Sequence, residues 1–98
     1  MSITAYHFWS PTCAPCKAIK PAVEDLKEEF SYISWVSVNT HDDKDGISSK
    51  YSVTLVPTIV IETKNDNGDV VLVEKQSGTN IAQYYRIIRS ALRSSQQS

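Results

Sequence analysis

The fold of this chain depends on the stretch Phe8-Trp9-Ser10-Pro11-Thr12-Cys13-Ala14-Pro15-Cys16-Lys17. Up to Pro11 the sequence is typical of a strand, because residues 3–9 are rich in aromatic and β-branched side chains. From Ala14 onward, apolar residues recur at intervals of three and four, which is typical of a helix. The sequence therefore predicts that both cysteines lie where a strand passes into a helix.

The chemistry of the two cysteines is the better explanation for their presence. They are the only cysteines in the chain, and a bridge between them closes too short a loop to stabilise the fold. Cys13 stands just before the first helical turn, where free backbone amides and the helix dipole favour a thiolate, so we expect Cys13 to be the nucleophile. Cys16, one turn later, can then attack a mixed disulfide on Cys13.

Other interpretations of the cysteine pair stay open at this point. Paired cysteines also bind zinc, but structural zinc takes four protein ligands, and only the distant His7 and His41 could supplement the pair. A dimer bridged by zinc or an iron–sulfur cluster is a more remote alternative, and two ordinary buried cysteines are another. We predict a redox pair and no metal site.

The remaining sequence predicts a single domain of alternating strands and helices. The turn sequence at 65–68 joins two strands into a hairpin, and Pro57 stands at the start of the first of them. The predicted order is β-α-β-α-β-β-α, an α/β fold with a central mixed four-stranded sheet flanked by helices. We expect this domain to span 1–93, followed by a flexible polar tail at 94–98. The predicted strands are 3–9, 33–38, 58–62 and 69–75, and the helices are 14–30, 47–51 and 81–92.

Composition excludes several classes of protein. The 98 residues carry 10 Lys+Arg against 11 Asp+Glu, a formal net charge of −1, which argues against a nucleic-acid binder. The longest apolar stretch, 53–61, is far shorter than the ~20 residues of a membrane span. The N-terminal residues do not resemble a secretory signal. We therefore expect a cytoplasmic protein, a monomer, with no membrane or nucleic-acid partner.

The stretch at 8–17 resembles the active-site segment of the thioredoxin family. Pro21 stands five residues after Cys16, as the family's helix-kinking proline does. Val56-Pro57-Thr58 is similar to the family's cis-proline segment, and Gly78 stands near the glycine that borders its substrate groove. The resemblance covers about residues 3–93. It implies a minimal thioredoxin-like fold that lacks the family's first strand and helix, with one exposed sheet edge.

The resemblance implies a thiol–disulfide oxidoreductase that reduces protein disulfides through its Cys-Ala-Pro-Cys dithiol. Cys13 would attack the substrate and Cys16 would resolve the intermediate. Thr12, Trp9, Val56, Pro57 and Gly78 would bind the substrate. The resemblance implies no bound cofactor and an NADPH-dependent thioredoxin reductase as the electron donor. The alternatives are a glutaredoxin-like reductase that uses glutathione and a non-catalytic binding module, which the intact cysteines argue against.

Several residues depart from the family pattern. Thr12 stands in place of a tryptophan, Ala14 in place of a glycine, and Leu55 in place of a small residue. His7 replaces a buried aspartate, and Ser37 stands where many members have a lysine. His7 is therefore either the group that accepts a proton from Cys16 or a structural histidine. In either role, burial should lower its pKa and keep it neutral.

Overall fold

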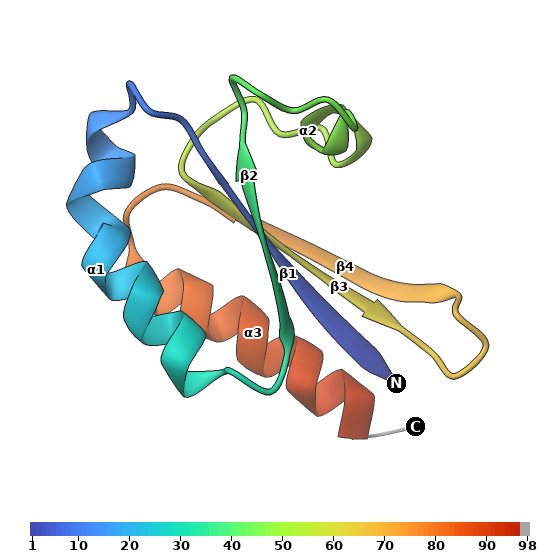
Figure 1. Ribbon diagram of the computed structural model, residues 1–98. Coiled ribbons are helices and arrows are strands. Elements are labelled where there is room, and N and C mark those ends of the chain that lie inside the picture. Colours follow the sequence, from blue (N-terminus) through green and yellow to red (C-terminus); the bar gives the residue numbers. More distant parts are fainter. Residues whose placement is uncertain (97–98) are drawn as a thin grey trace.

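The computed structural model describes residues 1–96 (Figure 1). The elements follow the predicted β-α-β-α-β-β-α order and form one four-stranded sheet with the strand order β2-β1-β3-β4. The strands are β1 (Ser2–Trp9), β2 (Ser34–Asn39), β3 (Thr58–Lys64) and β4 (Val70–Ser77), and the helices are α1 (Ala14–Glu29), α2 (Ile47–Lys50) and α3 (Ile81–Gln96).

The sheet is mixed, as the sequence predicts. β1 lies in its centre, parallel to β2 and antiparallel to β3, while β3 and β4 form the antiparallel hairpin. The β1–β3 register places Phe8 opposite Thr58, and Ser2 opposite Lys64. Because β1 and α1 are consecutive, the end of this central strand delivers the two cysteines to one end of the sheet, next to the start of β3.

The two faces of the sheet are covered differently. α1 and α3 lie together on one face, and the short α2 lies on the other (Figure 1). Alternating residues of β1 serve both faces: Ile3 and Ala5 belong to the larger core beneath α1 and α3, and Phe8 belongs to a smaller cluster with Val38 and Val60. His7 follows the alternation of Ile3 and Ala5, so its side chain lies on the face that α1 covers.

The element ends differ from the prediction by a few residues. β3 continues to Lys64 and β4 to Ser77, because the hairpin pairs further than its apolar residues indicate. α3 continues to Gln96, so the predicted tail at 94–98 begins inside a helix, and residues 97–98 lie outside the described part of the chain. α1 runs through Pro21. Within residues 1–96, no helix combines the length and apolar character that crossing a membrane requires.

Candidate active site

The cysteine pair lies at the start of α1, where the sequence places it. Cys13 is the N-cap residue of this helix, and a disulfide joins it to Cys16, with 5.2 Å between the two Cα atoms. The backbone amide of Cys16 donates a hydrogen bond to Cys13 Sγ at 3.1 Å. Pro15 occupies the first turn, where a missing amide costs no helical hydrogen bond. A thiolate on Cys13 would thus meet a backbone donor and the positive end of the helix dipole.

The loop before β3 faces the disulfide. The peptide bond between Val56 and Pro57 is cis, as the resemblance to the thioredoxin family implies. The carbonyl oxygen of Val56 lies 3.6 Å from Cys13 Sγ. Thr58 Oγ1 donates to the carbonyl of Leu55 at 2.7 Å, which ties this loop to the first residue of β3. The loop therefore brings backbone polar groups beside the reactive sulfur.

Gly78 and Tyr84 hold the cis-proline loop from the opposite side. The amide of Gly78 donates to the carbonyl of Pro57 at 3.0 Å, and Gly78 has a φ of +105°, a conformation that favours glycine. The hydroxyl of Tyr84 donates to the carbonyls of Pro57, at 3.3 Å, and Gly78. Tyr84 is fully buried, and burial raises its pKa to about 12, so the hydroxyl stays protonated. The sequence indicated Tyr84 only as an apolar core residue of α3.

Side chains of different character surround the mouth of the site. Thr12 and Leu55 are exposed, and Leu55 shows 65% of its surface. Trp9 is half-buried, and its indole nitrogen donates to Ser37 Oγ at 2.7 Å. Ser37, which stands where many family members have a lysine, therefore holds Trp9 in place. Trp9 and Thr12 lie near the disulfide, on opposite sides of Pro11, but Trp9 lines the cavity described next rather than the loop that faces Cys13.

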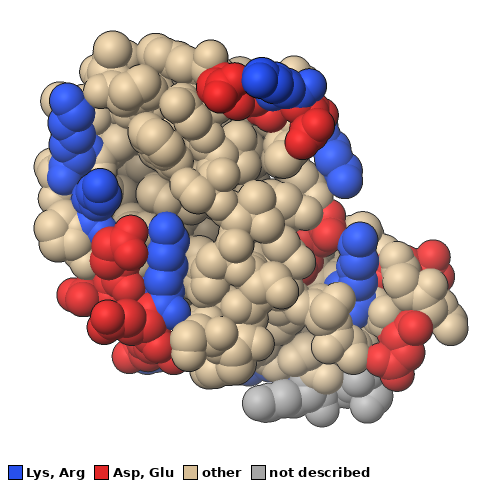
Figure 2. Space-filling view, viewed as in Figure 1, with Lys and Arg blue, Asp and Glu red and all other residues tan. Residues whose placement is uncertain are grey.

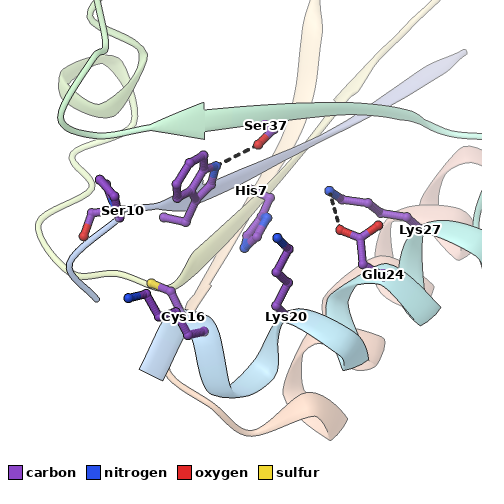
Figure 3. A pocket seen from close by; sticks show the side chains of 10 residues that line it. His7, Ser10, Cys16, Lys20, Glu24, Lys27 and Ser37 are labelled. Carbon is purple, nitrogen blue, oxygen red and sulfur yellow. Dashed lines mark hydrogen bonds and ion pairs between the residues drawn. The ribbon is translucent and has the colours of Figure 1, made fainter. Parts of the chain in front are cut away.

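A cavity of about 370 Å³ lies behind the disulfide on the side of Cys16 (Figure 3). His7 and Cys16 both line it. The side chain of His7 is only 7% exposed, and neither ring nitrogen has a hydrogen-bond partner within the described residues. Burial lowers the pKa of His7 to about 4, helped by the Lys27 ammonium and opposed by the Glu24 carboxylate. His7 is therefore neutral at physiological pH.

Charged residues of α1 form one wall of this cavity, which the sequence analysis did not indicate. Lys20 and Glu24 follow Cys16 at helical intervals of four, and Lys27 follows Glu24 by three. That spacing places them on the face of α1 that carries Cys16, and it was the signal available in the sequence. His41, in contrast, lies in an exposed loop. Among residues 1–96, no cluster of three or more metal-binding side chains is present.

Comparisons with known proteins point to one family. A family model described as thioredoxin matches residues 3–86. The chain is 36% identical over 66 residues to a thioredoxin of Pyropia yezoensis, a match that covers 66% of this chain and 61% of that protein. A thioredoxin of Mycoplasma genitalium is 41% identical over 54 residues, covering 55% of this chain and 52% of that protein. The structure of a thioredoxin from Fasciola hepatica superposes with a TM-score of 0.74 at 28% identity, covering 92% of this chain and 81% of that one.

Proposed function

Because this chain belongs to the thioredoxin family, we propose that it is a thiol–disulfide oxidoreductase that reduces protein disulfides with Cys13 and Cys16. The match spans about three fifths of the length of the Pyropia relative, so activity, substrates and partners are part of the proposal. The observation that carries it is the Cys13–Cys16 disulfide at the start of α1, with the carbonyl of Val56 3.6 Å from Cys13 Sγ.

The reaction uses both sulfurs and moves two electrons. The Cys13 thiolate attacks one sulfur of the substrate disulfide, which forms a Cys13–substrate bond and releases the other substrate sulfur as a thiol after it takes up a proton. The Cys16 thiol then loses its proton and attacks Cys13 Sγ. That step forms the intramolecular disulfide and releases the second substrate thiol, so the structure corresponds to the oxidised product.

The substrate lies, in this proposal, along the cis-proline loop. Val56 offers backbone groups next to Cys13 with which an extended substrate segment can pair, and Pro57 and Gly78 shape the loop. Thr12 and the exposed Leu55 border the same mouth, so we expect them to contact the substrate residues on either side of its disulfide. Trp9 precedes the loop that carries Thr12, and its indole is fixed by the hydrogen bond to Ser37.

His7 accepts the proton of Cys16 in this proposal. The neutral imidazole lines the same cavity as Cys16 and has two unpartnered nitrogens. A pKa of about 4 makes His7 a weak base, so its contribution should be severalfold rather than many hundredfold. The alternative role is packing alone, and the two roles differ in how His7→Ala behaves.

We propose a cytoplasmic, monomeric protein that binds no cofactor and receives its electrons from a thioredoxin reductase, with NADPH as the ultimate donor. The reduction potential should lie at about −240 to −280 mV, near the reducing end of the family's range, because Ala14 and Pro15 add no donor to the thiolate beyond the backbone. Equilibration with a glutathione buffer measures it. A value near −120 mV, typical of strong oxidants, would contradict a role as a reductase.

Insulin reduction tests the activity and the donor together. We expect turnover with NADPH and thioredoxin reductase, and little with glutathione and glutathione reductase. Cys13→Ser is the inactive control. Activity with glutathione alone would identify a glutaredoxin-like enzyme, and no activity with either system would support a non-catalytic module.

A further inference from the structure

The cavity behind Cys16 is large enough for a small ligand and is lined by polar groups that can bind one. Its volume is about 370 Å³, whereas one water in the liquid takes roughly 30 Å³, so it can hold more than a few waters. His7 closes its inner end with two unpartnered ring nitrogens. Buried polar groups in native proteins are almost always hydrogen-bonded, to the protein, to water or to a ligand. The imidazole nitrogens therefore need hydrogen-bond partners, which water or a bound ligand in the cavity can supply.

The charge of the cavity wall favours an anion. Lys17, Lys20 and Lys27 contribute to it, and Glu24 is the one acidic residue lining it. Lys27 lies 3.5 Å from the Glu24 carboxylate, but within residues 1–96 no carboxylate lies within ion-pair distance of Lys17 or Lys20. Figure 2 shows basic side chains beside a hollow on the α1 side of the molecule, and in Figure 3 the ammonium end of Lys20 points toward the ring of His7. A concave surface with this excess of positive charge concentrates anions.

We propose that this cavity binds a short-chain monocarboxylate, with the carboxylate between Lys20 and His7 and the alkyl group against Trp9 and Pro11. One carboxylate oxygen accepts a hydrogen bond from the Lys20 ammonium, and the other accepts one from the N–H of the imidazole. Trp9 and Pro11 also line the cavity and give part of its wall an apolar character that suits an alkyl group. The Glu24 carboxylate in the same wall disfavours a doubly charged ion such as phosphate.

Lys20 is exposed, and its ammonium end lies beside the ring of His7. The ring nitrogens of His7 are buried, so in this proposal the carboxylate reaches them when nearby side chains move, which the flexible stem of Lys20 allows. The bound anion would place a negative charge near Cys16 and raise the pKa of its thiol in the reduced protein. This last effect rests on the proposed function, whereas the binding itself does not.

NMR titration of the ¹⁵N-labelled, disulfide-bonded protein with sodium acetate tests the binding. Sodium chloride at matched ionic strength is the reference. We expect a saturable shift of the His7 ring nitrogens with acetate, and an affinity about tenfold weaker in Lys20→Gln, the loss typical of one charge-assisted hydrogen bond. Lys44→Gln is the matched control, because Lys44 is equally exposed but lies in the loop before α2, outside this cavity.

Three results would overturn the proposal. One is a shift that grows linearly without saturation, as expected if only water occupies the cavity. Another is an equal loss of affinity in Lys20→Gln and Lys44→Gln. The third is inorganic phosphate binding as tightly as acetate. Since the oxidised protein is titrated without substrate, these results are independent of whether the protein reduces insulin.

Discussion

Cys13 and Cys16 share a disulfide, but mainly backbone groups surround Cys13 and mainly side chains surround Cys16. Around Cys13 the chain presents backbone: the amide of Cys16, the carbonyl of Val56 and the loop that Gly78 supports. Around Cys16 it presents side chains, namely the His7 imidazole and the charged wall that α1 contributes. Backbone geometry survives changes of residue type, whereas side-chain chemistry does not. The contacts of Cys13 can therefore stay the same when residues change. A change of side chain near Cys16, in contrast, alters the proton acceptor and the charge beside that sulfur.

The largest expected effect separates the two cysteines themselves. Cys13→Ser should abolish disulfide reduction, because Cys13 is the sulfur at the helix start that the Cys16 amide bonds, and one cysteine alone cannot form the product disulfide. Cys16→Ser should also block turnover but accumulate a covalent complex with the substrate, because attack can occur and release cannot. Non-reducing electrophoresis after mixing with oxidised substrate distinguishes them. A complex trapped through Cys16 in Cys13→Ser would reverse the assigned roles.

The next largest effect is on the free energy of unfolding, and it comes from His7, which lies near Cys16. The pKa of His7 is about 4 in the folded protein against 6.5 for a free histidine, so between these pH values the unfolded chain binds the additional proton. The free energy of unfolding should therefore fall as the pH drops from 6.5 to 4, by about 3 kcal/mol from this residue.

Urea unfolding across that pH range measures the effect. His7→Leu should lose this part of the pH dependence, and His41→Gln, which changes an exposed histidine, should keep it. Equal slopes in wild type and His7→Leu would mean that the pKa of His7 is the same in the folded and the unfolded chain.

A smaller effect tests the Cys13 side. Tyr84→Phe removes the hydroxyl that bonds the carbonyls of Pro57 and Gly78, which should cost about 1–2 kcal/mol of unfolding free energy. A looser cis-proline loop should raise KM for insulin more than it lowers kcat. Tyr32→Phe is the control, since Tyr32 is 69% exposed. Unchanged stability and KM in Tyr84→Phe would show that the Tyr84 hydroxyl does not hold the loop.

The smallest effect concerns proton transfer. His7→Ala should slow release of the substrate from Cys13 severalfold near neutral pH, and His7→Asp should keep most of the rate because a carboxylate can also accept the proton. Stopped-flow reduction of a model disulfide across the neutral range measures both variants. If His7→Ala and His7→Asp both match the wild type, His7 is a packing residue.

The sequence predicted the Cys13 side better than the Cys16 side for a physical reason. A strand followed by Pro11, a Cys-x-x-Cys pair and a helical period are local patterns, and local patterns locate the disulfide without tertiary information. The cis-proline loop was found through resemblance. The bonds of Tyr84 depend on where α3 packs, so its periodicity gave only the buried face. The charges of α1 have the spacing of a solvated surface, and only the position of His7 beneath them shows that part of that surface lines a cavity.

The register of β1 against β3 has a consequence for the order of assembly. It joins residues fifty or more positions apart, Phe8 with Thr58 and Ser2 with Lys64, so the centre of the sheet closes only after most of the chain is available. The two cysteines, in contrast, are close neighbours in sequence, and their bond can form in a chain that has not yet folded. The Cys13–Cys16 disulfide is therefore not evidence that the chain has folded. The carbonyl of Val56 comes to lie beside Cys13 Sγ only when β3 joins β1.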